Sequence, residues 1–197
     1  MSNKNFILIL IISIFIIGCT NHFPLKEDIT STQNEFLNQD SILVKFPEVI
    51  QNKISLVAMV YTNCPDICPL TTHNMILIEK KLSNNDLEKI RFVVISFDPV
   101  RDTPSILKSY ARVRELNLNH WILLTGDKKN TTEVMKKFNV KAIPVDSTYD
   151  ERGNLNYSII HTDRMSLVDQ NGKIRKHYSG STANIDEIVN DIKILLN

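Results

Sequence analysis

The sequence predicts an α/β domain, in which flanking helices cover a central mixed sheet that a C-terminal β-hairpin and helix complete. Two continuous apolar runs, at 55–62 and 90–97, are typical of strands buried on both faces. A segment with helical periodicity follows each run, so we expect parallel strands joined by crossover helices. The 197 residues, 43% of them apolar, suffice for one domain with extensions. A net charge of +1 without a basic stripe argues against a nucleic-acid partner.

The N-terminal segment MSNKNFILILIISIFIIGCT has the features of an export signal. Its apolar stretch, 6–17, is shorter than the about 20 residues of a membrane span and fits a secretory core. The ending Ile-Ile-Gly-Cys resembles the bacterial lipobox, in which the cysteine is lipidated. We therefore expect a lipoprotein signal peptide at 1–18, lipidation of Cys19 and a polar tether over 19–40; an uncleaved signal anchor is the alternative. The domain would then lie in the bacterial cell envelope, lipid-anchored to the membrane and facing the periplasm, where thiols meet oxidants.

The body, 41–197, holds the remaining predicted elements. The first strand, 55–62, precedes a helix at 69–82, in which Met75, Ile78 and Leu82 share a face. After the strand at 90–97, Thr103 and Pro104 indicate a helix start, and this helix is expected to reach 118 with Ile106, Tyr110 and Val113 facing inward. Further along we expect a strand at 120–125, a helix at 131–138, a hairpin of 164–169 and 173–178 around an Asn-Gly turn, and an amphipathic helix at 184–196.

Cys64 and Cys68 lie four residues apart, between the first strand and its helix. A helix-like linker would place their Cα atoms about 6 Å apart, inside the roughly 4.4–6.8 Å range of disulfides, and would also let both sulfurs bind one soft ion. The helix N-terminus favours thiolates there. This placement is thioredoxin-like. A structural disulfide, a redox couple and half of a metal site remain open, and a metal would need a methionine or one of five histidines as a further ligand: His22, His73, His120, His161 and His177.

Three separated segments carry a resemblance to a known family. YTNCPDICPLTTHNM, at 61–75, resembles the copper-site segment of the SCO/SenC family; SFDPVRDTP, at 96–104, is similar to its S-x-D-P-x-R-D-T-P signature; and LTGD, at 124–127, matches a third segment. His161 falls where the family has its distal histidine. The resemblance implies a thioredoxin-like SCO/SenC domain that binds one copper ion, Cu(I) or Cu(II), through Cys64, Cys68 and His161.

The resemblance also implies a role and partners. We expect a copper chaperone, rather than an enzyme, that delivers copper to the binuclear centre of cytochrome c oxidase. Its partners would be the copper-bearing oxidase subunit and other copper chaperones or thiol reductants. The alternative is a membrane-anchored thiol–disulfide oxidoreductase, in which Cys64 attacks a partner disulfide and Cys68 resolves it, so that the pair forms a disulfide when oxidised.

The loop after the second strand is the other candidate for a role in the site. Asp98, Arg101 and Asp102 emerge at the same sheet edge as the cysteines. They either form local ion pairs and helix caps, or orient the ligands. We expect the segment 144–158 to be a loop that brings His161 to the cysteines. Met59, Met75 and Met165 are expected in the core, and His73 on the exposed face of its helix.

Overall fold

The computed structural model describes residues 23–149, 151 and 155–197. Its strands are β1 Glu27–Asp28, β2 Glu35–Asn38, β3 Leu43–Lys45, β4 Ile54–Val60, β5 Ile90–Ser96, β6 Trp121–Thr125, β7 Ala142–Tyr149, β8 Leu155–His161, β9 Met165–Val168 and β10 Lys173–Tyr178. Its helices are α1 Phe46–Ile50, α2 Ile67–Lys81, α3 Asn84–Leu87, α4 Pro104–Val113, α5 Lys128–Lys137 and α6 Ile185–Leu196. Eight strands form one mixed sheet in the order β1-β10-β9-β4-β5-β6-β2-β3, and β7 and β8 form a separate ribbon.

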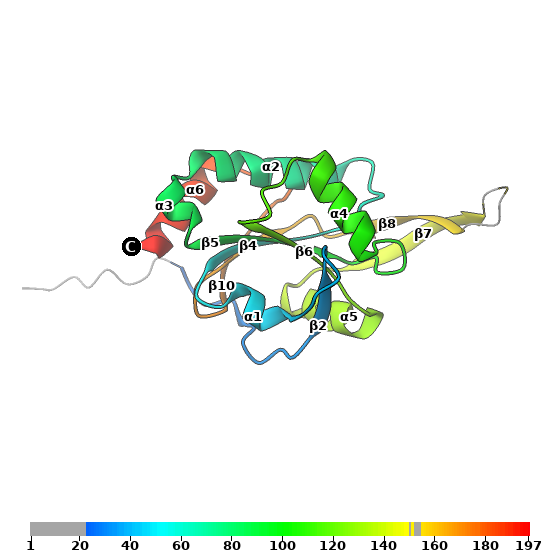
Figure 1. The fold of residues 1–197 in the computed structure, drawn as a ribbon, viewed down its shortest axis with the longest axis horizontal. Coiled ribbons are helices and arrows are strands. Elements are labelled where there is room, and N and C mark those ends of the chain that lie inside the picture. The colour runs from blue at the N-terminus through cyan, green and yellow to red at the C-terminus, as the bar shows by residue number, and fades with distance from the viewer. Residues whose placement is uncertain (1–22, 150, 152–154) are drawn as a thin grey trace, which may run out of the picture.

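The parallel centre of the sheet confirms the predicted alternation. β4 pairs with β5 from Ile54↔Ile90 to Val60↔Ser96, and β5 pairs with β6 in parallel as well. Every residue of β4 is buried, as its apolar run predicts. α2 and α4, which connect the parallel strands, cover one face of the sheet, as right-handed crossovers made in one direction along a sheet require; α5, which leads to the ribbon, covers the other face (Figure 1). Because β4 and β5 end side by side, the loops that follow them meet at one edge.

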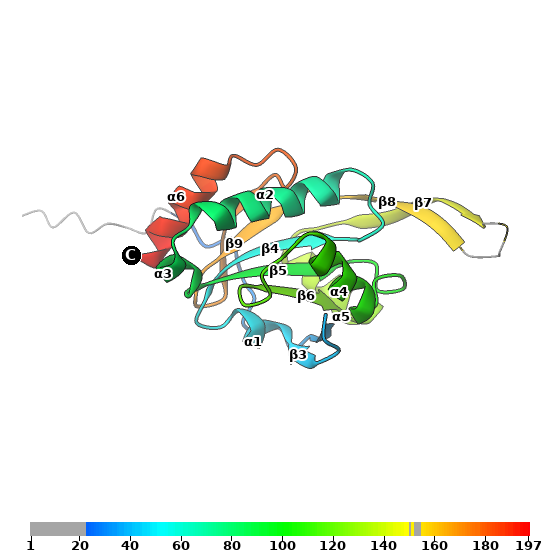
Figure 2. The same ribbon diagram turned by 45° about the horizontal axis from the view of Figure 1, so that its top comes forward.

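The C-terminal part completes the sheet as predicted. β9 pairs antiparallel with both β4 and β10, which makes the sheet mixed. In the turn between β9 and β10, Gly172 has a φ of 69°, a conformation that glycine adopts without strain. α6 lies beside α2 on the same face (Figure 2) and buries Ile188 and Ile192 against it and the sheet.

The predicted tether is wrong over its described part. β1 and β2 lie in 23–40, and Phe23, Ile29 and Phe36 are only 6%, 0% and 1% exposed. These apolar side chains are separated by polar residues, among which Thr32 and Asn34 are themselves buried, so the segment has a polar sequence although it is anchored in the core. The signal peptide at 1–18 and Cys19 lie outside the described residues. Within the described residues, no helix combines the length and the apolar content needed to cross a bilayer.

Several helices differ from their predicted bounds, and α5, expected at 131–138, spans Lys128–Lys137. α2 begins at Ile67 rather than 69, which places Cys68 in its first turn. α4 ends at Val113 rather than 118, and the prediction of its inward face is wrong for Ile106 and Val113, which are 43% and 78% exposed. The buried row is Leu107 and Ala111, one helical turn apart, which packs on the sheet.

The segment 144–158 belongs to a ribbon and not to a loop. β7 pairs with β8 from Ala142↔His161 to Tyr149↔Leu155, with an irregularity after Val145. The ribbon extends away from the body (Figure 2). Alternate residues of β8, at 157, 159 and 161, face the body, since side chains alternate along a strand. His161 is therefore carried by the strand at the base of this ribbon.

Candidate metal centre

The two cysteines lie where β4 leads into α2. The backbone N–H of Cys64 donates to the Tyr61 carbonyl at 3.2 Å, and the N–H of Cys68, in the first turn of α2, points at Cys64 Sγ at 3.4 Å. Both thiols are free, with Cys64 9% and Cys68 1% exposed. Burial raises the pKa of the Cys68 thiol, since the thiolate would lose its hydration. At Cys68, burial thus outweighs the expected preference of a helix N-terminus for thiolate.

His161 closes the group from the end of β8. Its Nε2 lies 3.5 Å from Cys68 Sγ, and its Nδ1 lies 3.1 Å from the carbonyl oxygen of Thr162. Because a carbonyl only accepts, this contact assigns the proton to Nδ1 and leaves the Nε2 lone pair directed at the cysteines. The imidazole ring packs 4.9 Å from the Phe97 ring and 6.0 Å, edge to face, from the Tyr61 ring. These contacts fix the orientation of the ring.

The structure brings together the three residues that the sequence proposed as ligands. Sγ of Cys64, Sγ of Cys68 and one ring nitrogen of His161 all lie within 4.8 Å of one another. Metal bonds to thiolate and imidazole are about 2.0–2.3 Å long, so two ligands of one ion can be separated by up to about 4.6 Å. A slight contraction therefore suffices, and the donor set of two soft sulfurs and an imidazole suits copper.

The other candidate ligands lie elsewhere. Met59, Met75 and Met165 are buried in the core, as predicted. His73 is exposed on α2, also as predicted, and His177 bonds to the Ser166 hydroxyl in the β9–β10 pair. His22 is outside the described residues.

Asp102 secures the approach to the cysteines. Its carboxylate is 0% exposed and accepts hydrogen bonds from the backbone N–H of Thr62 at 3.0 Å and from the hydroxyls of Thr62 and Ser96, each at 2.5 Å. Burial raises its pKa, and the hydrogen bonds oppose that shift. Since Thr62 lies two residues before Cys64, Asp102 holds the start of the cysteine loop against the loop after β5.

Asp98 and Arg101 instead hold the ribbon. Arg101 forms an ion pair with Asp98, which is 3% exposed, and donates from Nη1 to the Tyr157 carbonyl at 2.9 Å. The guanidinium also lies 3.6 Å from the centre of the Tyr157 ring, and the Tyr157 hydroxyl donates to Asp98 at 2.5 Å. We call Asp98, Arg101 and Tyr157 the ribbon clamp. It joins the loop after β5 to the strand that carries His161.

Tyr157 is the residue that the sequence reasoning missed. Its pKa is raised to about 12, mainly by burial and by its hydrogen bond to Asp98, so it stays a neutral donor. An aromatic residue four positions before His161, and so on the same face of a strand, is the signal that could have found it. The signal is usable only once 155–161 is known to be a strand.

Asp163 provides a further anchor just after His161. Its carboxylate accepts from the backbone N–H and the hydroxyl of Ser181, from the Ser179 hydroxyl and from Thr71 on α2. The hydrogen bonds lower its pKa despite burial. Asp163 thus connects the chain beyond β8 to the first half of α2, the helix that begins at the cysteines.

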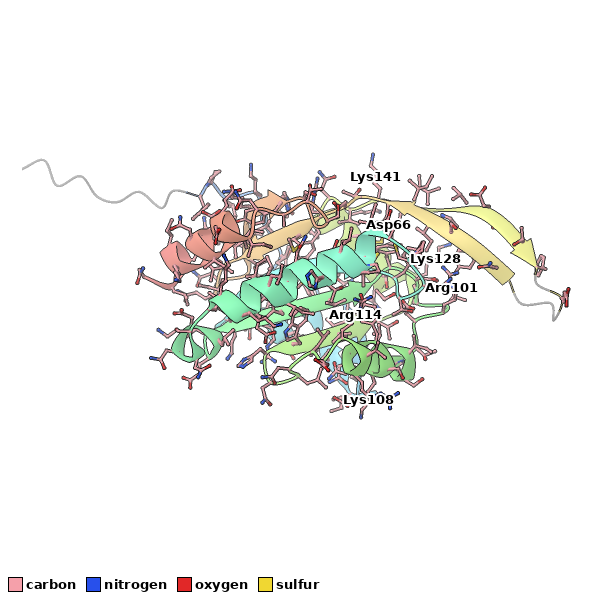
Figure 3. All side chains as sticks on the ribbon, turned by 90° about the horizontal axis from the view of Figure 1, so that it is seen from above. Asp66, Arg101, Lys108, Arg114, Lys128 and Lys141 are labelled. Atoms are coloured by element: carbon pink, nitrogen blue, oxygen red, sulfur yellow. The ribbon has the colours of Figure 1, made fainter. Side chains whose placement is uncertain are left out.

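Charged side chains surround this end of the molecule. Figure 3 shows Asp66 at the start of α2 and Arg101 and Lys141 toward the base of the ribbon, whereas Lys128 begins α5 on the opposite face of the sheet (Figure 1). The fold and this site together define a thioredoxin-like α/β protein in which a dithiol and an imidazole meet at one point.

Comparison with known proteins then assigns the family. The sequence model described as SCO1/SenC matches residues 25–197, and the chain belongs to the SCO1/SenC family. This agrees with the resemblance seen in the sequence motifs.

Three solved structures are similar over most of their length. A SCO1/SenC family lipoprotein from Bacillus anthracis is 29% identical with a TM-score of 0.68, covering 89% of this chain and 96% of that one. ScoI from Bradyrhizobium japonicum, solved with copper bound, is 26% identical with a TM-score of 0.69, covering 82% and 96%. BsSco, described as a member of the Sco family of cytochrome c oxidase assembly proteins with a disulfide switch, is 28% identical with a TM-score of 0.65, covering 86% and 94%.

Proposed function

We propose that this protein binds one copper ion through the thiolates of Cys64 and Cys68 and Nε2 of His161, and delivers it to the binuclear copper centre of cytochrome c oxidase during assembly. The observation that carries the proposal is the convergence of three soft-metal donors within 4.8 Å, although His161 is 93 residues from Cys68 in sequence. The copper-bound ScoI structure and the description of BsSco as an oxidase assembly protein support it.

The chemistry of the site suits a carrier that must also release its cargo. The buried Cys68 thiol loses its proton when copper binds, so binding and release of the ion are coupled to a proton. Cys64, at 9% exposure, is the less deeply buried of the two cysteines, so a recipient would approach the copper from its side. With three protein ligands, copper keeps room for an incoming ligand of the recipient.

Metal content and affinity of single-site variants test the copper site. We expect one copper per chain in the parent, loss of tight binding in Cys64→Ser and Cys68→Ser, and weakened Cu(II) with largely retained Cu(I) binding in His161→Ala, since two thiolates suffice for Cu(I). His73→Ala, the exposed histidine of α2, is the matched control and should behave as the parent. Equal Cu(II) affinity in His161→Ala and the parent would remove His161 from the site.

Delivery is tested separately from binding. The copper-loaded chain is mixed with the metal-free soluble domain of the oxidase subunit, and the absorption of the binuclear centre is followed. Its appearance, with loss of copper from this chain, is the expected result. Retention of copper by a chain that binds it tightly would reject delivery and leave copper binding in place.

We also propose that Cys19 carries a lipid that anchors the domain to a membrane of the cell envelope, outside the cytoplasm and facing the periplasm. The sequence of the export signal supports this location, and the similar B. anthracis protein is described as a lipoprotein. Cys19→Ala should shift the protein from the membrane to the soluble envelope fraction. Unchanged membrane association in that variant would point to an uncleaved anchor.

A thiol–disulfide oxidoreductase is the second candidate. The observation that favours it is that Cys64 and Cys68 are both free, lie close together and differ in exposure, as an attacking and a resolving thiol would. Reduction of a disulfide in the oxidase copper domain should then need both cysteines and proceed in His161→Ala at the parental rate. A chaperone role predicts instead that His161→Ala fails to complete the binuclear centre even when the recipient is already reduced.

A further inference from the structure

A groove lies beside the start of β7, the strand that pairs with the His161-bearing strand β8. It has a volume of about 490 Å³ and is bounded by α5, the start of β7 and the loop after β5. Phe97, Met135 and Ile143 are among its apolar walls. Phe97 is shared with the metal centre, because its ring also packs 4.9 Å from the His161 ring. Ala142, another lining residue, is the strand partner of His161. Any occupant of the groove would therefore sit next to the copper site.

The charge on the rim of the groove has one sign. Lys128, Lys136 and Lys141 line it and are exposed, whereas no lining residue is acidic. Within the described part of the chain, none of these three ammonium groups is in an ion pair, unlike the neighbouring Lys137, which pairs with Glu27. The groove thus offers three uncompensated positive charges around an apolar floor.

The floor also holds a polar group without a partner. Thr131 lines the groove from α5, is 2% exposed, and its hydroxyl has no hydrogen-bond partner among the described residues. Because the hydroxyl oxygen itself is closed off, it offers no contact to an occupant, and Thr131 lines the groove with its other atoms.

The surroundings indicate a protein rather than a small anion as the occupant. Ile143 and its cross-strand partner Ile160 are 60% and 66% exposed, so an apolar surface continues from the groove onto the ribbon. Val100, on the neighbouring loop, is 81% exposed. Exposed apolar residues gathered beside a charged rim are typical of protein interaction sites.

We infer that this groove docks an acidic segment with an apolar tip, on the protein that exchanges copper with the site. The inference rests on the proposed copper function and names the chemistry of the partner: carboxylates that face Lys128, Lys136 and Lys141, and an apolar side chain between Phe97 and Ile143. Docking there places the partner's own ligands beside His161. The lysines speed the encounter and align the partner, and they do not bind the metal.

Binding of a synthetic peptide to the full chain in detergent tests the inference. The probe is a short peptide in which glutamates flank a pair of leucines, and the matched probe carries lysines in place of the glutamates. The groove variant is Lys128→Glu/Lys136→Glu/Lys141→Glu. The control variant, Lys80→Glu/Lys89→Glu/Lys193→Glu, makes the same charge change at exposed lysines far from the groove. Fluorescence anisotropy gives the affinities at low and high salt.

We expect the parent and the control variant to bind the acidic probe with similar, salt-sensitive affinity, and the groove variant to bind it at least about tenfold more weakly. Thr131→Val removes a buried hydroxyl that an occupant of the groove does not reach, so we expect it to bind the acidic probe as the parent does and to serve as an uncharged control. Equal affinities in the groove and control variants, or no preference for the acidic probe, would overturn the inference.

Copper measurements on the same samples separate this test from the proposed function. The groove variant should hold as much copper as the parent, because its substituted residues are not ligands, and should transfer it more slowly to the soluble oxidase domain. A parent that binds the acidic probe but holds no copper refutes the proposed function and leaves the docking surface in place. Full copper content with the same transfer rate in the groove and control variants refutes docking alone.

Discussion

Replacing Arg101 with Met tests whether the ribbon clamp positions His161. Met keeps an apolar side chain of similar length and removes the guanidinium. In the structure this group pairs with Asp98, donates to the Tyr157 carbonyl at 2.9 Å and lies 3.6 Å from the centre of the Tyr157 ring. Arg101→Met therefore breaks a buried ion pair and releases the strand that carries the ligand.

The size of the effect follows from burial. Removing one partner of a fully buried ion pair costs about 3–5 kcal/mol. Asp98 is 3% exposed but the Arg101 side chain is 20% exposed, so we expect a smaller loss in the free energy of unfolding, about 2–4 kcal/mol. Cu(II) affinity should fall towards that of His161→Ala, which sets the limit, whereas Cu(I) affinity should change little.

The double variant Asp98→Asn/Arg101→Met separates stability from positioning. It removes the orphaned carboxylate charge, so most of the lost stability should return. The contacts from residue 101 to Tyr157 remain absent, so Cu(II) affinity should stay low. Urea denaturation of the metal-free proteins and Cu(II) competition against a chelator measure the two quantities. Parental Cu(II) affinity in Arg101→Met would refute the positioning role, and a double variant as unstable as the single one would refute the assignment of the lost stability to the orphaned carboxylate.

Three further predictions concern the scaffold. Phe36→Ala should lower the free energy of unfolding by about 3–5 kcal/mol, because Phe36 is 1% exposed in β2. Leu25→Ala, at a 52% exposed position, should change it by less than about 0.5 kcal/mol. Equal effects of the two variants in urea denaturation would indicate that this segment is a tether that does not contribute to the core. Gly180→Ala would place a Cβ against Asp163 and Thr71 and should lower the free energy of unfolding by about 1–3 kcal/mol in the same assay. An unchanged free energy of unfolding would show that the loop around Gly180 shifts to accommodate the methyl group. Burial lowers the pKa of His177 in the folded state, so the unfolded chain takes up the proton first as the pH falls. The melting temperature should therefore drop below about pH 6.5. His177→Gln should reduce this pH dependence, and an unchanged dependence in that variant would contradict the prediction.

The elements that could be predicted are those whose local pattern and tertiary environment agree. The run over β4 is apolar throughout because both faces of that strand are covered. The start of α4 was predicted by Thr103 and Pro104, and the Thr103 hydroxyl does accept from the Ile106 N–H at 3.4 Å. Such signals act within a few residues and need no partner from elsewhere in the chain.

The failures share the opposite property. β2 was missed because it has only four residues and pairs with β6, some 87 positions later, and because it buries the polar Asn38 while it exposes the apolar Leu37, so no apolar–polar alternation marks it. The inward face of α4 was misplaced because periodicity marks several apolar rows, and only packing on the sheet selects Leu107 and Ala111. The β7–β8 ribbon was missed because much of its surface is exposed, so burial leaves little pattern in its sequence.

The sequence alone determined the chemical groups of the site. It placed two thiols at a strand-to-helix junction and a charged loop after the neighbouring strand, and its family motifs identified His161 as the third ligand. The tertiary structure decided what lies beside what. It brought His161 to Cys68 across 93 residues, Arg101 to Tyr157 across 56, and Asp102 to Thr62 across 40. The physical reason is that local propensities act over a few residues, whereas the order and register of the strands set which distant side chains meet.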